Sequence, residues 1–285
     1  PPRSTPKPSS AASDVYKRQI YMDTKEVNSV NTPLIVSDGC CVHFGNIPAL
    51  EGVNFSISRG KKVAVVGPNG GGKSTLFNAL AGLIPLTEGS LKIDGKSPNE
   101  VKGKVSYVPQ KDLINWNFPL SVKQVVEMGV TTNKVSSLFD RKKINDKIKK
   151  ALQDVGLEEK INDNIKSLSG GQLQRVLIAR ALAQDSEILL LDEAFSAVDI
   201  GAQEDIMQLI NSINLDGKTI LIATHDVNNL EEKFDEVLCL NKHCCAYGDP
   251  SEVLTPEVIE EMYGSHTELF MNKSHFKTEG NNSND

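Results

Sequence analysis

The sequence predicts an α/β fold built around a parallel sheet that is buried on both faces. Segments 62–66, 187–191, 219–223 and 236–240 are nearly continuous aliphatic runs, which is typical of strands covered by helices on both sides. Helical patterns lie between these runs, and no segment repeats at a fixed period. Of the 285 residues, 39% are hydrophobic and 24% are charged, which excludes a largely disordered chain.

Charge and hydropathy exclude further classes of protein. The chain has 31 Lys+Arg against 37 Asp+Glu and a net charge of −6, which argues against a broad nucleic-acid surface. Its aliphatic runs are far shorter than the roughly 18 apolar residues that a membrane helix needs. Five cysteines without the spacing of a secreted disulfide framework indicate a reducing, cytoplasmic compartment.

The cysteines invite a metal site, because Cys40 and Cys41 lie near His43, and Cys244 and Cys245 follow His243. Adjacent residues of a strand point to opposite faces, however, so neighbouring cysteines chelate one ion poorly. We expect buried or half-buried strand cysteines, with metal sensing as the alternative.

The two ends differ from the rest of the chain. Residues 1–19 are rich in proline, serine and positive charge, and they predict a disordered segment of adapter or vector origin. Residues 272–285 predict a disordered polar tail. The folded domain is expected to span 31–268.

Within this domain, 34–44 and 50–57 predict antiparallel strands joined at Gly45-Asn46. The pattern from Ser121 to about residue 183 is mostly helical and opens with a capping box to Gln124. Two stripes of apolar residues at helical spacing predict core-facing helices: Leu76, Leu80 and Leu83, and then Leu173, Val176, Leu177 and Ala181. The charged stretch 140–150 predicts a solvated helix face.

A glycine-rich segment after strand 62–66 matches G-x-x-x-x-G-K-[ST] and runs into a helix. Glycines let the backbone fold around phosphate oxygens and offer them N–H groups, to which the helix adds its positive end. Lys73 would bind the β- and γ-phosphates, and the Ser74 hydroxyl would bind Mg²⁺. The predicted nucleotide-binding residues are Gly67, Pro68, Asn69, Gly70, Gly71, Gly72, Lys73, Ser74 and Thr75.

The strand at 187–191 ends in two carboxylates, Asp192 and Glu193. Asp192 can hold Mg²⁺ through water, and Glu193 can orient or deprotonate the water that attacks the γ-phosphate. Solvated acids are common at strand ends, but beside a phosphate loop the pair predicts hydrolysis.

A second anion site is predicted where Ser169, Gly170 and Gly171 open a helix that continues from Gln172 to Ala183. One nucleotide does not need two phosphate cradles in one chain. The second cradle therefore suggests a nucleotide held by another copy.

Five motifs now stand in order: GPNGGGKST, YVPQ, LSGGQLQR, ILLLDEAFSAVD and ATHD. Together they resemble the nucleotide-binding subunit of ATP-binding cassette (ABC) transporters. The resemblance implies a P-loop NTPase core with an antiparallel β subdomain and an inserted helical subdomain at about 112–183. It also implies a head-to-tail homodimer with ATP and Mg²⁺ between the loop of Lys73 and Ser169–Gln172 of the other copy.

The same resemblance implies roles for single residues. Gln110 would bind Mg²⁺ and couple to the permease, and with Glu193, His225 and Lys73 it would form the catalytic group. Asp199 would lie at the dimer seam and Phe44 would stack on adenine. The family more often has Tyr than Phe at position 44, and Pro than Ala after Glu193.

The segment around Trp116 resembles the manganese, zinc and iron importer group, with Asn115 and Asn117 in place of the usual acids. Trp116 and Phe118 would anchor a permease helix, or they would fill the core of the helical subdomain.

The expected function is ATP-driven metal import by a protein on the inner face of the plasma membrane. Its partners would be integral-membrane permease subunits and, indirectly, a substrate-binding protein, with no nucleic acid. The alternatives are a cassette ATPase of iron–sulfur cluster assembly, a transporter ATPase for a non-metal cargo, and a catalytically silent cassette.

Overall fold

The computed structural model describes residues 33–101, 103–110, 119–130, 138–195 and 200–264. The expected disordered ends 1–19 and 272–285 lie outside these residues. So do Asp199, Trp116 and Phe118.

A six-stranded sheet forms the centre of the molecule, in the order β5-β6-β7-β3-β8-β9. The first five strands are parallel, and β9 pairs antiparallel with β8. The bounds are β3 (Lys62–Val66), β5 (Val105–Val108), β6 (Ile188–Asp192), β7 (Thr219–Thr224), β8 (Glu236–Asn241) and β9 (His243–Gly248). The four strands expected from their aliphatic runs are confirmed, and the edge strands β5 and β9 are additions.

A separate antiparallel sheet has the order β2-β1-β4. It consists of β1 (Ile35–Phe44), β2 (Ile47–Ile57) and β4 (Glu88–Ile93). The expected hairpin with its turn at Gly45-Asn46 is confirmed. Strand β4, which opens Glu-Gly-Ser, lacks the aliphatic run that marks the other strands and was not expected.

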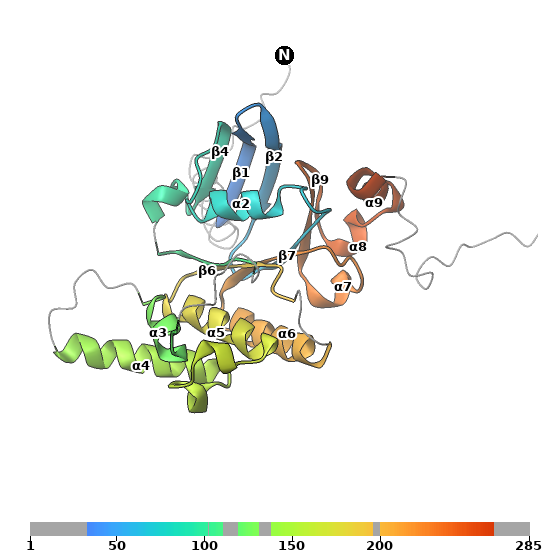
Figure 1. Ribbon diagram of the computed structural model, residues 1–285. Coiled ribbons are helices and arrows are strands. Elements are labelled where there is room, and N and C mark those ends of the chain that lie inside the picture. The colour runs from blue at the N-terminus through green and yellow to red at the C-terminus, as the bar shows by residue number, and fades with distance from the viewer. Residues whose placement is uncertain (1–32, 102, 111–118, 131–137, 196–199, 265–285) are drawn as a thin grey trace, which may run out of the picture.

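Helices cover the six-stranded sheet on both sides (Figure 1). Helix α2 (Lys73–Leu80) lies on the side of the antiparallel sheet, and the helical layer lies on the other. That layer contains α3 (Val122–Glu127), α4 (Leu138–Asp154), α5 (Gly170–Ala183) and α6 (Ile200–Leu215). The chain also has short 3₁₀ helices at Pro98–Val101, Glu158–Lys160 and Ile165–Ser167. Helices α7 (Leu230–Lys233), α8 (Pro250–Val253) and α9 (Pro256–Tyr263) lie beside β8 and β9.

The central strands contribute side chains to two hydrophobic cores, because successive side chains of a strand point to opposite faces of the sheet. Val63 and Val65 of β3 pack with α2 and the antiparallel sheet, whereas Ala64 and Val66 pack with the helical layer. The expected Ser121–Gln124 capping box is present at the start of α3. The observed architecture is the one that the family resemblance implied.

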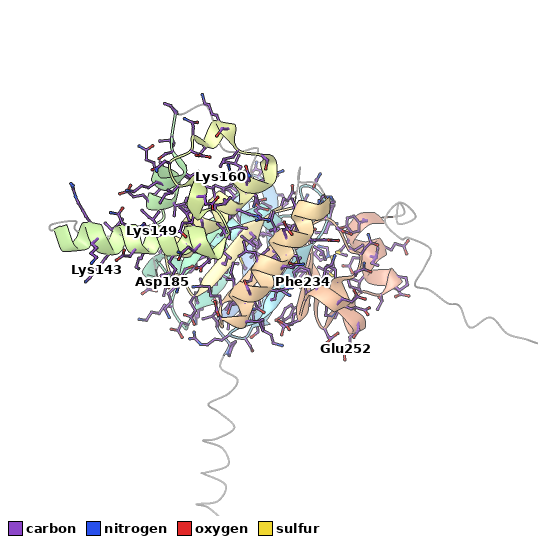
Figure 2. All side chains as sticks on the ribbon, turned by 90° about the horizontal axis from the view of Figure 1, so that it is seen from below. Lys143, Lys149, Lys160, Asp185, Phe234 and Glu252 are labelled. Atoms are coloured by element: carbon purple, nitrogen blue, oxygen red, sulfur yellow. The ribbon has the colours of Figure 1, made fainter. Side chains whose placement is uncertain are left out.

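Helix α4 has the expected solvated face. Its Ile144 and Ile148 side chains are buried, while Lys143 and Lys149 are exposed on the outside of the helical layer (Figure 2).

One expectation about the core is wrong. Leu76 and Leu80 are buried as the helical spacing predicted, but Leu83 is 64% exposed. Helix α2 ends at Leu80, and Gly82 follows with a φ of 68°. The chain has therefore left the helix before Leu83, so the spacing no longer places that residue on the core face.

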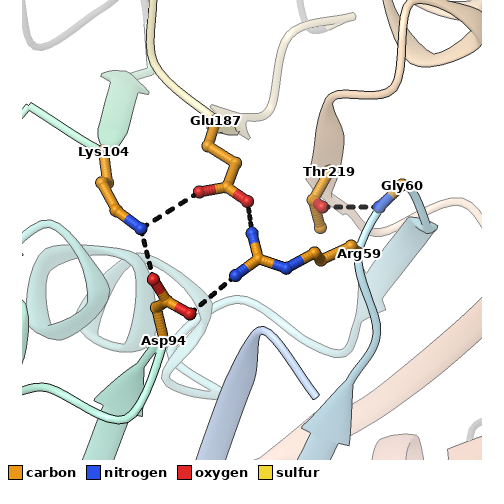
Figure 3. Close-up of polar contacts among 6 residues, drawn as sticks. All are labelled: Arg59, Gly60, Asp94, Lys104, Glu187 and Thr219. Carbon is orange, nitrogen blue, oxygen red and sulfur yellow. Dashed lines mark hydrogen bonds and ion pairs between the residues drawn. The ribbon is translucent and has the colours of Figure 1, made fainter. Parts of the chain in front are cut away.

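Four alternating charges connect the two sheets (Figure 3). Arg59 pairs with Asp94 at 2.6 Å and with Glu187, while Lys104 pairs with Asp94 at 2.5 Å and with Glu187 at 3.4 Å. The hydrogen bond and the charge from Lys104 hold the pKa of Asp94 below its usual value. The network links the end of β2, the end of β4 and the starts of β5 and β6.

Among the described residues, no helix is both long enough and apolar enough to cross a bilayer. All five cysteines are free thiols on strands, with Cys40 and Cys239 buried and the other three half-buried.

Candidate nucleotide-binding and hydrolytic site

The phosphate loop connects β3 to α2, as the sequence predicted. Gly72, the residue before the helix, has a φ of 96°, and an added Cβ would lie 2.6 Å from the carbonyl oxygen of Ala49. At Gly67 an added Cβ would overlap the carbonyl oxygen of Leu240 on β8. Both positions therefore need glycine because the backbone of another strand passes against the loop.

Lys73 lies buried in the loop, with 5% of its surface exposed. Its Nζ donates to the carbonyl oxygens of Gly67 at 2.8 Å and Pro68 at 3.0 Å. Burial lowers the pKa of the Lys73 ammonium, and the negative charges of Glu193 and Asp192 oppose this shift. A cavity of about 330 Å³ opens here, lined by Ala49, residues 69–75, Gln110 and Glu193.

Asp192 and Glu193 differ sharply in environment although they are adjacent at the end of β6. Asp192 is 1% exposed, and its Oδ2 accepts a hydrogen bond of 3.0 Å from the hydroxyl of Tyr107 on β5. Glu193 has a φ of 49°, in the left-handed region, and its N–H donates to the carbonyl oxygen of Ala223 on β7. This turn sends the Glu193 side chain into the cavity beside the phosphate loop.

Gln110, two residues beyond the end of β5, meets Glu193 directly. Its Nε2 donates a 2.8 Å hydrogen bond to Oε2 of Glu193. The structure thus brings together two residues that are 83 positions apart and that the resemblance placed in one catalytic group.

His225 follows β7 and is exposed. It lines a second cavity of about 700 Å³ together with Glu193, Phe195 and residues of α6 and α7. Because Glu193 lines both cavities, the predicted base lies between the phosphate loop and His225.

Ser169 is the N-cap of α5, which begins at Gly170 rather than at the expected Gln172. The Ser169 hydroxyl accepts from the N–H of Gln172 at 3.3 Å, and Oε1 of Gln172 accepts from the N–H of Ser169 at 3.1 Å. Ser169, Gly171 and Gln172 line a cavity of about 550 Å³, and of the described residues lining it none belongs to the phosphate loop.

Phe44 is the last residue of β1, is 55% exposed and pairs with Ile47 at the hairpin tip. The next residues of β2 lead to Ala49, which borders the phosphate-loop cavity. The adenine contact of Phe44 stays a prediction, as do the other residue roles, and Asp199 lies outside the described residues.

Two contributors to the site were not expected. Tyr107 belongs to the YVPQ motif, but the sequence predicted no role for it. Its hydroxyl donates to Asp192, and Arg180 donates to its backbone carbonyl. The turn after β8 also supports the loop, because the N–H of Lys242 donates to the carbonyl of Gly71 at 2.7 Å. No sequence pattern marks Lys242 for this contact.

These features define a P-loop nucleotide-binding site with a carboxylate pair and a glutamine at the carboxyl edge of a parallel sheet. The chain belongs to the ABC transporter family, whose model matches residues 50–196. The resemblance and the ABC ATPase fold are therefore confirmed, and the chain is an ATPase of this family.

Named relatives match most of the chain. It is 39% identical to the manganese transport system ATP-binding protein MntB of Halalkalibacterium halodurans, over 85% of this chain and 96% of that protein. It is 37% identical to the zinc transport system ATP-binding protein TroB of Treponema pallidum, over 76% and 82%.

Solved structures agree in fold. One is cbiO1 from Clostridium perfringens, part of the ABC transporter complex cbiONQ, with a TM-score of 0.69, 26% identity and coverage of 84% and 99%. Another is a nucleotide-free ATP-binding cassette from an ABC transporter, with a TM-score of 0.69, 25% identity and coverage of 80% and 98%.

Proposed function

We propose that this chain is the ATP-hydrolysing subunit of an importer for a divalent metal cation: manganese, zinc or iron. The observation that carries the hydrolytic part is the cavity in which the phosphate loop, Gln110 and Glu193 meet. The cargo class is supported by the relatives, which are named for manganese and zinc transport.

Several groups of the chain have roles in the hydrolytic step. Lys73 and the N–H groups of the loop hold the phosphates, and the buried position of Lys73 strengthens its interaction with them. Glu193 accepts a proton from the attacking water while the water oxygen bonds to the γ-phosphorus and the bond to ADP breaks. The hydrogen bond from Gln110 fixes the Glu193 carboxylate, and His225 approaches the γ-phosphate from the second cavity.

The residues present fit Mg²⁺, which prefers hard oxygen ligands. Ser74 offers a hydroxyl at the start of α2 and Gln110 an amide oxygen in the same cavity. Asp192 is buried behind them with its carboxylate fixed by Tyr107. When bound, the ion would neutralise phosphate charge as the leaving group departs.

Transport requires more than one chain. The second cradle at the start of α5 belongs to a different cavity from the phosphate loop, which supports an ATP sandwiched between two copies. Closure of this homodimer would pull on integral-membrane permease subunits, which would hold the chain at the inner face of the plasma membrane. A substrate-binding protein would deliver the cargo.

The alternatives differ in partner and cargo. A cassette ATPase of iron–sulfur cluster assembly would not co-purify with a permease, and a transporter for a non-metal cargo would leave cellular metals unchanged. A catalytically silent cassette would lack the Lys73, Asp192 and Glu193 set that this chain has.

The test is the elemental content of cells that lack this gene, grown with limiting manganese, zinc and iron. The cells are complemented with the wild-type chain, with Glu193→Gln, or with Glu252→Gln as a matched control, because Glu252 is exposed on α8 (Figure 2). We expect selective loss of one metal, restored by the wild type and Glu252→Gln but not by Glu193→Gln. Unchanged metals, with ATP hydrolysis intact in the purified chain, would overturn the import function and leave the ATPase assignment standing.

A further inference from the structure

Three side chains of metal-ligating type meet at the edge of the six-stranded sheet. His243 and Cys245 belong to β9, and Glu261 belongs to α9, which packs against β9 (Figure 1). Their ligand atoms all lie within 4.8 Å of one another. Nε2 of His243 is 2.8 Å from Oε1 of Glu261 and 3.6 Å from Sγ of Cys245.

Strand geometry explains why Cys245, and not Cys244, joins this group. Residues two apart on a strand point to the same face, so His243 and Cys245 share a face and Cys244 takes the other. The pairing of β8 with β9 also shifts register between Cys239 and Leu240, which leaves Cys245 as the extra residue of a β-bulge. Bulges re-aim side chains, and the Sγ of Cys245 lies 3.6 Å from Nε2 of His243.

Helix α9 holds the third ligand in place. Ile259 and Met262 are buried against the core, so the helix is anchored, while Glu261 remains exposed beside β9. The backbone carbonyl of Glu261 also accepts a 3.5 Å hydrogen bond from Nδ2 of Asn241, which precedes the β8–β9 turn.

We propose that His243, Cys245 and Glu261 bind a borderline-soft divalent cation of the zinc type, with a water molecule as the fourth ligand. Nitrogen, sulfur and carboxylate oxygen are the donors that Zn²⁺ takes in proteins. Tetrahedral Zn²⁺ with ordinary bond lengths holds its nitrogen and sulfur ligands about 3.6 Å apart. The observed separation of Nε2 and Sγ is 3.6 Å, so these two ligands need no rearrangement.

The Glu261 carboxylate has to withdraw slightly, because zinc-bound nitrogen and oxygen lie about 3.4 Å apart. The side chains of His243 and Glu261 are 47% and 49% exposed, which leaves the carboxylate free to adjust and lets the ion enter from solvent. Burial, and then the charge of Glu261, raises the pKa of the Cys245 thiol to about 11. The ion therefore displaces the thiol proton when it binds.

The cation site is next to the nucleotide site but separate from it. Lys242, which supports the phosphate loop through Gly71, directly precedes His243 in the turn between β8 and β9. The proposal goes beyond the proposed function, because it concerns binding of an ion to the isolated chain and requires neither ATP nor a permease.

The experiment titrates Zn²⁺ alone into the purified full chain, without a polyhistidine tag, against a chromophoric chelator. Variants Cys245→Ser, His243→Ala and Glu261→Gln remove one ligand each. Cys244→Ser is the matched control, because it changes the neighbouring thiol on the opposite face of β9. Circular dichroism melting checks that each variant folds, and Co²⁺ serves as a spectroscopic probe of thiolate ligation.

We expect one Zn²⁺ per chain. Cys245→Ser and His243→Ala should each weaken the zinc affinity at least about tenfold, and Cys244→Ser should leave it unchanged. A Co²⁺–thiolate charge-transfer band should be present in the wild type and in Cys244→Ser and absent in Cys245→Ser. Equal zinc affinity of the wild type and of all three ligand variants would overturn the site. So would a Cys244→Ser variant as impaired as Cys245→Ser. The group would then be a hydrogen-bonded surface cluster only.

Discussion

The hydroxyl of Tyr107 provides a direct test of how the acid pair is held. Burial, and then the charge of Asp192, raises the pKa of this phenol well above its ordinary value, so the hydroxyl stays protonated and donates to Asp192 at neutral pH. Tyr107→Phe removes only the donor. The ring is retained, and with it the edge-on contact with Phe77 at a centroid distance of 6.3 Å.

The expected magnitude follows from the burial of the acceptor. A hydrogen bond to a charged group contributes about 1.5–3 kcal/mol, and Asp192 at 1% exposure has little solvent to replace the lost donor. The free energy of unfolding should fall by that amount, which corresponds to a decrease in melting temperature of roughly 3–12 °C for a domain of this size. Urea unfolding measures this change in free energy as a shift of the denaturation midpoint, provided that the slope with urea concentration stays the same in both proteins.

A double-mutant cycle with Asp192→Asn assigns the effect to this pair. If the hydroxyl acts through Asp192, the two substitutions are non-additive, and Tyr107→Phe costs less in the Asp192→Asn background. A loss below about 0.5 kcal/mol, or full additivity, would refute the reasoning.

Three further predictions concern catalysis, the loop and pH. Glu193→Gln should lower the rate of ATP hydrolysis about 10²–10⁴-fold while ATP affinity stays nearly constant. The reason is that a glutamine side chain still accepts the hydrogen bond from the Gln110 amide but cannot take a proton from water. Equal rates for the variant and the wild type in a phosphate-release assay would contradict this. Gly72→Ala should abolish binding of a fluorescent ATP analogue, whereas Gly70→Ala should weaken it less, because both have positive φ but only the Gly72 position is sterically blocked. The stabilising contribution of Asp94 should be present above its ordinary pKa of 3.8 and disappear as pH falls through its lowered folded pKa, so the urea midpoints of wild type and Asp94→Asn should converge in acid. A difference that persists in acid would argue against the hydrogen bond and charge of Lys104 as the cause.

Much of the central sheet could be predicted because its chemistry is local. A strand buried on both faces in a parallel sheet reads as a continuous aliphatic run, and 62–66 and 219–223 therefore matched β3 and β7 closely. Strand β9, His-Cys-Cys-Ala-Tyr-Gly, lies at an edge and is half-buried, so it carries neither a run nor a clean alternation. Its position follows from pairing with β8, which the sequence of β9 alone does not specify.

The phosphate loop could be predicted because its glycines and Lys73 form one contiguous motif of fixed spacing, although the strands that pass against Gly67 and Gly72 lie elsewhere in the sequence. The contacts that complete the site are long-range. Tyr107 and Asp192 are 85 residues apart, and the bond between Gln110 and Glu193 depends on the left-handed turn at Glu193. Such a turn in a non-glycine residue is enforced by its surroundings and leaves no signature in the residue itself.

The order of the sheet explains why these distant residues meet. Strands β5, β6, β7 and β3 are adjacent and parallel, so their carboxyl ends lie along one edge. In that order they lead to Gln110, to the acid pair at Asp192, to His225 and to the phosphate loop. Each strand thus contributes one segment of the predicted site. Hydrogen bonds from Tyr107 of β5 to Asp192, and from Gln110 just beyond β5 to Glu193, fix neighbouring segments against each other. The geometry of hydrolysis therefore depends on strand pairing as much as on the reacting side chains.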